Sequence, residues 1–283
     1  MWPEDVEHRL HVRDIDGGAE VGEAEDELVV AASTFKVAVA LAFFDLAAAG
    51  SLDPAERITL PTGARTDGPT GVSILQDDVS LTLRDAAALM LTISDNAATD
   101  AVLARIGVDA VHDRLRELGL VDTYLHGGCM QLMDTIANDL GFTGWETLVR
   151  TEGEISTGEL LASRTFDAAR TTRTTAREMT GLLAAIWRDE AGDPRACAEV
   201  RRLMGLQVTR DRLAAGFPAE VRVAAKSGSW FRVVRNEIGV AEYEDGRRYA
   251  LAVFTRTAEP QARRPDVDRA IGEAARAAVD SLR

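Results

Sequence analysis

The feature that most constrains the fold is an apolar, alanine-rich segment at residues 31–50, AASTFKVAVALAFFDLAAAG. Residues 34–49 have the length and composition of an α-helix, and Gly50 is the residue type that commonly follows a helix end. Apolar residues lie on nearly every side of this helix, which is typical of a helix at the centre of a domain. We therefore predict a buried helix around which the other elements pack.

The same segment does not have the pattern of a membrane span or of a leader. Ser33, Thr34, Lys36 and Asp45 interrupt it, and the residues before it, GEAEDE, are acidic where a signal peptide is basic. The sequence as given carries no export signal. On this basis we expect a cytoplasmic protein, or a secreted one if a leader has been removed.

The composition narrows the classes of partner. The net charge is −14 and no run of five or more basic residues occurs, so binding to nucleic acid or to an anionic membrane is disfavoured. A hydrophobic fraction of 46% with 28% charged residues is ordinary for a folded globular chain. We expect a monomer that acts on a small-molecule substrate.

The cysteines and histidines do not have the spacing of a metal site. Cys129 and Cys197 lie far apart, which favours two free thiols over a disulfide. The four histidines are scattered, and no ligand pattern such as HExxH is present. We expect neither a metal nor another cofactor.

Strand-like segments occur at both ends of the chain. Residues 6–33 contain two or three short strands, with Asp16–Gly18 as a hairpin turn. Strands return after residue 220, with Asp245–Gly246 as a second turn. A helix follows Pro265 and closes the chain.

The middle of the chain has mostly helical periodicity. A turn-rich stretch, LPTGARTDGPTGVS, leads into it, and capping pairs start two of its helices, Thr82 with Asp85 and Thr175 with Glu178. Strands from the two chain ends can then pair in one antiparallel sheet, with the helical middle inserted as a second lobe.

We therefore predict an α+β fold. Residues 1–58 and 205–283 form the sheet lobe, and residues 59–204 form an all-helical lobe that includes a long Ω-loop-like segment, residues 126–170. A cleft between such lobes is the usual place for a site.

Lysine is rare in this chain, and both copies lie in short motifs. Only Lys36 and Lys226 occur, against thirty arginines, although of the two residue types only lysine readily gives up its proton. Ser33 lies one helical turn before Lys36, at a helix start where backbone N–H groups stabilise negative charge. A neutral Lys36 could take the proton of Ser33 and make it a nucleophile. The simpler explanation is a helix cap followed by a surface lysine.

Two further triplets accompany this pair. Ser94–Asn96, SDN, lies in a turn between predicted helices, and Lys226–Gly228, KSG, ends a predicted strand. Taken singly, SDN is an ordinary helix cap and KSG a strand end with a turn glycine. In the order S-x-x-K, S-D-N, K-S-G they are the signature set of the penicillin-recognising serine enzymes.

The sequence thus resembles the class A β-lactamase family over nearly the whole chain. The stretch LTLRDAAALMLTISDNAATDAVLARIG is especially similar to that family's helices around SDN. The resemblance implies a β-lactamase/transpeptidase-like fold: a five-stranded antiparallel sheet flanked by N- and C-terminal helices, plus the helical lobe. It also implies a serine hydrolase that opens a β-lactam amide through an acyl-enzyme, as resistance enzymes and penicillin-binding-like proteins do.

Roles for individual residues follow from the resemblance. Ser33 would be acylated, with Lys36 as its proton acceptor, directly or through water. Ser94 would relay a proton to the leaving nitrogen, and Asn96 would bind the side-chain amide of the substrate. Lys226 would lower the cost of charge around Ser94 and the substrate.

The strand that carries KSG would hold the substrate carboxylate through Ser227. The backbone N–H groups of Ser33 and of Ser229, the residue after Gly228, would form the oxyanion hole. Arg235, on the next strand, matches the position from which many class A enzymes direct an arginine to that carboxylate. Arg232 is an alternative, and a solvent-facing strand residue is the simpler explanation of Arg235.

One element of the family pattern is missing. The family hydrolyses its acyl-enzyme with a glutamate in an E-x-x-L-N motif, and none precedes the helix start at residues 170–179. The interval between SDN and that helix is also longer than the family usually has. The carboxylates available there are Glu146, Glu152, Glu154, Glu159 and Asp167, and most of them are expected to be solvated surface charges.

Three functions remain open at this point. The first is hydrolysis of a β-lactam through a Ser33 acyl-enzyme. The second is an esterase, amidase or peptidase-like enzyme of the same fold with weak β-lactam turnover, and the third is a sensor that stays acylated. The presence of Lys36 as well as Lys226 argues against a pure binder, whereas the missing E-x-x-L-N motif argues against rapid release.

Overall fold

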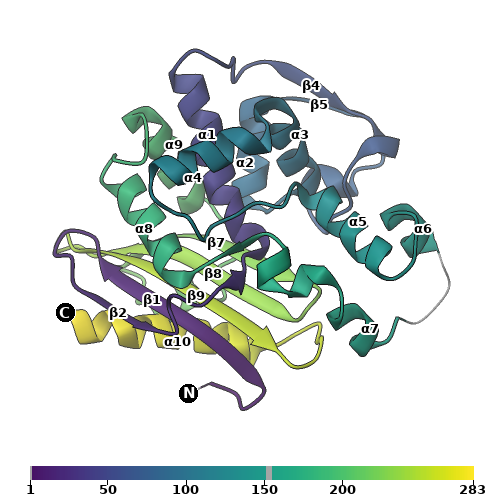
Figure 1. Ribbon diagram of the computed structural model, residues 1–283. Coiled ribbons are helices and arrows are strands. Elements are labelled where there is room, and N and C mark those ends of the chain that lie inside the picture. The colour runs from purple at the N-terminus through teal and green to yellow at the C-terminus, as the bar shows by residue number, and fades with distance from the viewer. Residues whose placement is uncertain (1, 151–154) are drawn as a thin grey trace.

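The computed structural model describes residues 2–150 and 155–283 (Figure 1). Its largest sheet has five antiparallel strands in the order β2-β1-β9-β8-β7. This arrangement confirms the predicted α+β fold. The strands are β1 Val6–Asp14, β2 Glu20–Glu23, β7 Arg222–Trp230, β8 Val234–Glu242 and β9 Arg248–Thr257.

The sheet joins the two ends of the chain. β1 pairs with β9 from Val6 opposite Thr257 to Asp14 opposite Tyr249. The two predicted hairpin turns are present, and Gly18 (φ +78°) and Gly246 (φ +88°) take the left-handed conformation that glycine adopts at low cost. β7 pairs only with β8 and is therefore an edge strand.

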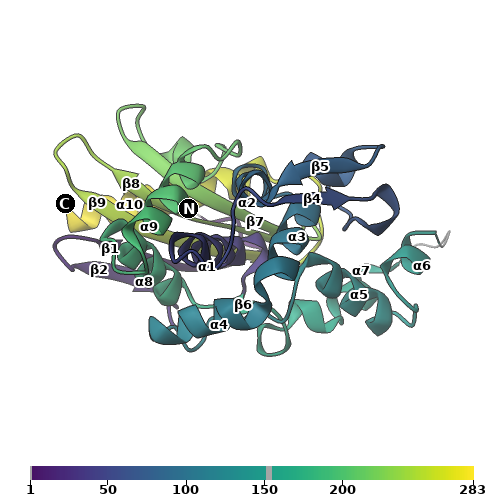
Figure 2. The ribbon, with the colours of Figure 1, turned by 90° about the horizontal axis from the view of Figure 1, so that it is seen from above.

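Helices cover both faces of this sheet (Figures 1 and 2). α10, Pro265–Leu282, packs on one face through Val267, Ile271 and Val279, all fully buried. α8, Ala176–Trp187, and α9, Pro194–Gly205, pack on the other face. Apolar side chains alternate between the two faces of the strands, so each face has its own core.

The predicted central helix is present as α1, Lys36–Ala48, preceded by a short 3₁₀ helix η1, Ala32–Phe35. Every residue from Lys36 to Phe44 is buried. Leu41 and Phe43 are fully buried, and each such side chain contributes about 1.5–3 kcal/mol to stability. Gly50 takes φ +74° after the helix end, as expected.

The remaining helices lie mostly away from the sheet, except η6, which contacts β7 and β8. They are α2 Leu83–Thr92, α3 Asn96–Ile106, α4 Val108–Glu117, α5 Cys129–Asp139, α6 Trp145–Arg150 and α7 Thr157–Leu161, with the short 3₁₀ helices η2 Thr62–Ala64, η3 Gly71–Ile74, η4 Arg164–Phe166, η5 Ala168–Arg170 and η6 Leu213–Gly216. Both predicted caps form: Thr82 accepts a hydrogen bond from the backbone of Asp85, and Thr175 accepts one from Glu178.

Two short strand pairs were not expected from the sequence. β4 Arg57–Leu60 pairs with β5 Val79–Thr82, and β3 Val29–Val30 pairs with β6 Arg173–Thr174. The first pair encloses the turn-rich stretch as a long loop. The second pair brings two distant segments together directly before η1.

The predicted lobe boundaries at residues 59 and 204 stay a prediction. α8 and α9 fall inside the predicted helical lobe, yet they contact β9 and β7 of the sheet. Within residues 2–150 and 155–283, no helix combines the length and the apolar composition that crossing a bilayer requires.

Candidate active site

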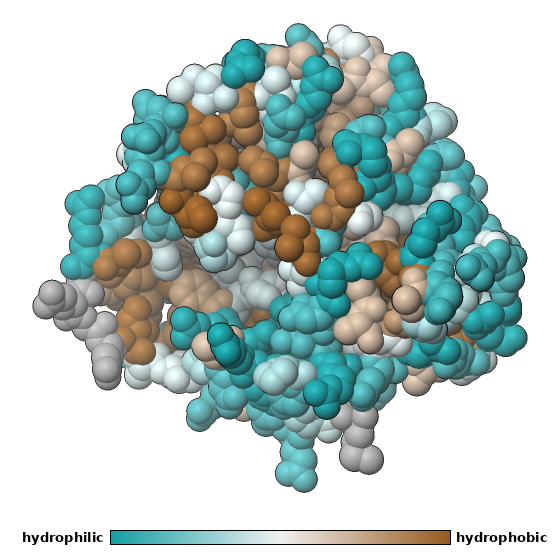
Figure 3. Space-filling model, turned by 180° about the vertical axis from the view of Figure 1, so that it is seen from behind, coloured by the Kyte–Doolittle hydropathy of each residue, from teal (hydrophilic) through white to brown (hydrophobic). Residues whose placement is uncertain are grey.

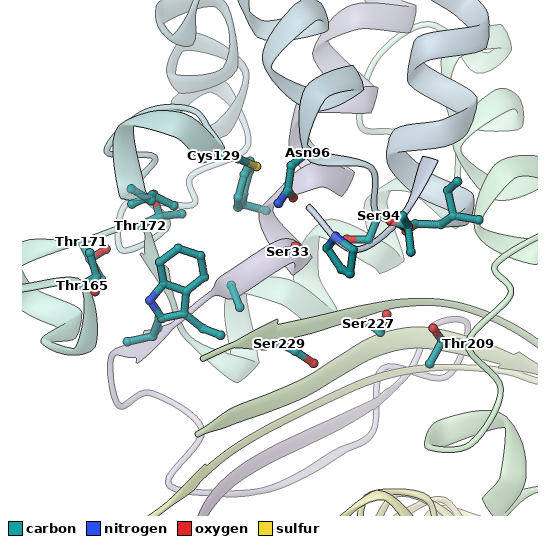
Figure 4. A pocket seen from close by; sticks show the side chains of 18 residues that line it. Ser33, Ser94, Asn96, Cys129, Thr165, Thr171, Thr172, Thr209, Ser227 and Ser229 are labelled. Atoms are coloured by element: carbon teal, nitrogen blue, oxygen red, sulfur yellow. The ribbon is translucent and has the colours of Figure 1, made fainter. Parts of the chain in front are cut away.

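A cavity of about 260 Å³ lies between the edge strand β7 and the helices above it. Ser33, Ser94, Asn96, Ser227 and Ser229 all line it, so four residues from the three sequence motifs, with the residue after KSG, meet at one place. In Figure 4, Ser33 lies between Asn96 on the helical side and Ser229 on the strand side. Seen from behind, the surface is hollowed, and apolar side chains gather beside the hollow (Figure 3).

Ser33 is held in η1, at the junction with α1. The residue before it, Ala32, has φ +46°, a conformation that costs an L-residue energy and so marks a constrained position. Strand β7 passes very close by at Gly228. A Cβ on Gly228 would lie 3.1 Å from the backbone nitrogen of Ser33, so glycine is what allows this approach.

Lys36, the first residue of α1 and three residues after Ser33, is fully buried. Its Nζ donates to the carbonyl oxygen of Ser94 at 2.8 Å and to Oδ1 of Asn96 at 3.0 Å. The Oγ of Ser94 is 3.3 Å away. Burial lowers the pKa of Lys36 below its ordinary value of 10.5, and neighbouring Cys129 and acidic side chains offset this only in part.

The SDN turn is fixed by its middle residue. Asp95 is fully buried and accepts hydrogen bonds from the backbone of Val72 at 2.6 Å and of Ala98 at 3.1 Å. It thereby caps α3 and ties the turn to η3. Ser94 takes φ +61°, which is uncommon for a residue other than glycine. Contacts with neighbouring residues therefore hold this turn in a backbone conformation that Ser94 would not favour on its own.

Lys226 lies on β7, fully buried beneath the cavity. Its Nζ donates to the carbonyl oxygen of Ser227 at 2.7 Å. Burial, and next the positive charge of Lys36, holds the pKa of Lys226 well below its ordinary range. The two lysines of this chain therefore lie close enough to disfavour each other's charged form.

A buried carboxylate supports the strand that carries KSG. Glu237 is fully buried and accepts from the backbone of Leu213 at 2.6 Å and from Nε2 of Gln207 at 2.9 Å. Gln207 in turn accepts a hydrogen bond from the backbone N–H of Ser227. Burial raises the pKa of Glu237, although the guanidinium of Arg212 opposes this. These contacts fix Ser227 from behind.

Arg235 does not lie where the sequence predicted. Its guanidinium is turned toward α10, where it contacts Asp268 at 3.3 Å and the carbonyl oxygens of Gln261 and Ala262, and it does not line the cavity. An ion pair with a residue 33 positions away on another element holds it there. The predicted contact with a substrate carboxylate is therefore not supported by its placement, and Arg232 does not line the cavity either.

A different arginine reaches the cavity wall. Arg212 is buried, is paired with Asp268 at 2.8 Å and donates to Oγ of Ser229 at 3.0 Å. It also donates to the carbonyl oxygens of Gly228 and Asn236. No sequence motif indicated Arg212, because its position depends on how η6 packs against the sheet.

The sequence also did not indicate Cys129 as a site residue. It is the first residue of α5 and lines the cavity, and its backbone N–H donates to Asp100 at 2.6 Å. Burial raises the pKa of the Cys129 thiol to about 11, although nearby Lys36 opposes this. The stretch CMQLM, Cys129–Met133, shares only its leucine with the E-x-x-L-N pattern. That leucine is the one sequence feature that could have pointed to Cys129 as a residue of the cavity.

The three candidate bases that fall within the described residues, Glu146, Glu159 and Asp167, do not line the cavity. Glu146 pairs with Arg150, Glu159 closes a capping box on Ser156, and Asp167 caps η5. Glu152 and Glu154 lie outside the described residues. Along the described chain, no aspartate or glutamate lines the cavity, and its far wall consists largely of Thr165, Thr171 and Thr172 (Figure 4).

This arrangement suits acyl transfer. A serine lies on a constrained turn, a buried lysine with a lowered pKa follows it by three residues, and strand β7 passes close to the serine backbone at Gly228. What the cavity lacks, within the described residues, is a carboxylate that could activate water.

Comparisons with known proteins agree with the geometry. A family model described as "Beta-lactamase enzyme family" matches residues 4–282. A curated relative, the beta-lactamase regulatory protein BlaB of Streptomyces cacaoi, is 29% identical over 288 residues, which cover 96% of this chain and 91% of that protein.

Solved structures show the same fold. A beta-lactamase from Sphaerobacter thermophilus superposes with a TM-score of 0.76 at 23% identity, covering 98% of this chain and 91% of that one. PBP-A superposes with a TM-score of 0.77 at 22% identity, covering 99% of this chain and 92% of that one. A variant of PBP-A has been solved as an acyl-enzyme complex with penicillin G.

Proposed function

Because the chain belongs to the beta-lactamase enzyme family, we propose that it is a serine hydrolase of class A type whose Ser33 is acylated by a β-lactam. The observation that carries this proposal is the placement of Lys36, which follows Ser33 by three residues, is fully buried, has a lowered pKa and donates to the SDN turn. A buried lysine whose pKa is lowered serves as a base better than as a structural cation.

Acylation would involve three proton transfers. Ser33 Oγ attacks the β-lactam carbonyl carbon while its proton passes to a neutral Lys36, directly or through water. The carbon–nitrogen bond of the ring then breaks, an ester forms on Ser33, and the nitrogen takes a proton from Ser94. The contact between Lys36 Nζ and Ser94 Oγ at 3.3 Å is the route by which Lys36 would return that proton.

Binding groups are available on both sides of the nucleophile. The backbone N–H groups of Ser33 and Ser229 would stabilise the oxyanion, and the side-chain amide of Asn96 would bind the amide of the substrate. The substrate carboxylate would be held by the hydroxyl of Ser227. Arg212, through Ser229, takes the charge-neutralising role that the sequence had suggested for Arg235.

Release of the acyl group is proposed to be slow. A thiol with a pKa of about 11 is protonated at neutral pH, so Cys129 cannot accept a proton from water as a carboxylate would. The hydroxyls of the threonine wall are weaker bases still.

A sensor function is the second candidate. It is favoured by the absence of a carboxylate from the described cavity lining and by the relative named as a regulatory protein. The two candidates share acylation of Ser33 and differ in the lifetime of the ester. An esterase or amidase of the same fold acting on another substrate would share the nucleophile but not the response to β-lactams.

Intact-protein mass spectrometry after mixing with a chromogenic cephalosporin separates these functions. We expect a covalent adduct on the wild type whose lifetime is much longer than the turnover time of an efficient β-lactamase. We expect no adduct on Ser33→Ala. Rapid colour with only a transient adduct would indicate efficient hydrolysis. No adduct on the wild type would leave only the esterase or amidase function, and an adduct on Ser33→Ala would refute the nucleophile.

A further inference from the structure

We infer that a ring of side-chain contacts closes the end of the cavity beside Asn96 and limits the size of the acyl substituent that Ser33 can accept. Trp145 on α6 is the residue that completes the ring. This inference rests on the proposed function, since it concerns which substrates the same nucleophile takes. It uses residues outside the three sequence motifs.

The ring begins at the helical wall of the cavity. Nδ2 of Asn96 donates to the carbonyl oxygen of Asp67 at 2.9 Å. The carboxylate of Asp67 then accepts a hydrogen bond from Nε1 of Trp145 at 2.6 Å. Asp67 therefore links Asn96, which lines the cavity, to a helix from the segment that is longer than the family usually has.

The ring continues to the strand wall through aromatic contacts. The ring of Trp145 meets Phe231 edge-on, with 6.0 Å between centroids. Phe231 meets Trp230 edge-on at 5.0 Å, and Trp230 lines the cavity. The bridge thus runs from Asn96 on one wall to Trp230 on the other.

Both anchors of Trp145 are held in place. Its backbone N–H donates to Asp134 of α5 at 2.9 Å, which fixes the start of α6. Phe231 has φ +44°, so the turn between β7 and β8 adopts a costly conformation that its packing on Phe166 helps to hold. Aromatic pairs of this kind add stability beyond that of their buried area.

The consequence is steric. Asn96 is the residue proposed to bind the substrate's side-chain amide, so the substituent on that amide points toward the ring. A small substituent stays inside the cavity, whereas a branched aryl group pushes against the Asn96 and Trp230 walls, which the contacts of Trp145 with Asp67 and Phe231 keep from moving apart. The structure therefore assigns selectivity for compact acyl groups to the Asp67–Trp145–Phe231 bridge.

The test is the acylation rate of Ser33 by three penicillins, measured by intact mass: one without an acyl substituent, one with a phenylacetyl group and one with a dimethoxybenzoyl group. In the wild type we expect the dimethoxybenzoyl compound to react slowest. In Trp145→Ala and Asp67→Ala we expect its rate, relative to the unsubstituted penicillin, to rise by about tenfold or more.

Two control variants distinguish loss of the Asp67–Trp145–Phe231 bridge from an unspecific effect of substitution on the acylation rate. Asp67→Asn keeps a carbonyl oxygen that can accept from Trp145 and should keep the wild-type ratio. Trp187→Phe removes an indole hydrogen bond to Glu242, away from the cavity, and should also keep it. Equal ratios in the wild type, Trp145→Ala and Asp67→Ala would overturn the inference.

Failure of the proposed function gives a different result. If no penicillin acylates the wild type, the same ratio is measured with an alkyl and a bulky aryl fluorophosphonate, which label nucleophilic serines without a β-lactam ring. A ratio that rises in Trp145→Ala then supports the bridge on its own. An unchanged ratio, or no labelling of Ser33 by either reagent, refutes it.

Discussion

The two walls around Ser33 differ in what their side chains can do with a proton. On one wall, Lys36 and Ser94 form a connected path of hydrogen bonds with a base whose pKa is lowered by burial. On the side formed by the head of α5 and by Thr165, Thr171 and Thr172, the cavity offers neutral groups only, although the Cys129 thiol lies close to Lys36. The first wall fits formation of an acyl-enzyme, and the second wall does not fit its hydrolysis.

In the proposed mechanism, formation and hydrolysis of the acyl-enzyme therefore rely on different parts of one cavity. Formation depends on residues in α1 and the SDN turn, which are fixed by deep burial and by the contacts of Asp95. Release depends on the segment after α4, where the chain has a thiol at the head of α5. The second segment can therefore differ without disturbing the first.

The largest expected effect is on formation. Lys36→Arg keeps the positive charge but cannot supply a neutral base, so we expect acylation of Ser33 to fall by about 10³-fold or more. Stopped-flow mixing with a chromogenic cephalosporin measures this. Lys36→Ala, which is smaller and fits the same space, should behave alike. Near-normal acylation in both variants would show that Lys36 is not the base.

The second prediction adds a carboxylate at the head of α5, where the described cavity lining has none. Cys129→Glu places a carboxylate beside Lys36, and we expect the acyl-enzyme to be released about 10²-fold faster. The measurement is the decay of the adduct by intact mass. Cys129→Gln, of the same size but without a base, is the control. An equal gain in both variants would mean that space rather than a carboxylate limits release.

The third prediction separates the walls by pH. Formation needs neutral Lys36, so its rate should rise with pH, by up to about tenfold per unit, and level off below the ordinary pKa of 10.5. Release should stay slow throughout that range, because the Cys129 thiol remains protonated up to about pH 11. A release step that rises in parallel with formation would contradict the contrast between the walls.

The smallest effect concerns stability. Thr172 is buried and its hydroxyl accepts a hydrogen bond from the backbone of His126 at 3.0 Å. Thr172→Val removes that acceptor, and we expect the free energy of unfolding to fall by about 1–3 kcal/mol. Urea denaturation measures it, with the exposed Thr143→Val as the control. No loss would show that the threonine wall is not held by this contact.

The fold and the position of Ser33 at the cavity were predictable because their signals are local. S-x-x-K fits within one helical turn, and the hairpin glycines and the caps at Thr82 and Thr175 act over three or four residues. The family is confirmed by the match over residues 4–282. The catalytic roles of Ser33 and Lys36 stay predictions.

The rest depended on tertiary packing. Arg235 was directed to the cavity by strand position alone, whereas an ion pair with Asp268 on α10 turns it away. Arg212 reaches Ser229 only because η6 lies against β7, and Cys129 reaches Lys36 only because α5 packs against α3. These contacts join residues that are far apart in the sequence, so no motif spacing predicts them.

The pairing of the first strand with the last has a consequence for how the chain is made. Synthesis runs from the N-terminus, so β1 leaves the ribosome long before Arg248–Thr257, the strand against which it pairs. Until then its Val12 and Leu10 have no β9 to cover them. The sheet therefore cannot close until nearly the whole chain has been made, and a chain stopped short of β9 is expected to aggregate rather than to fold in part.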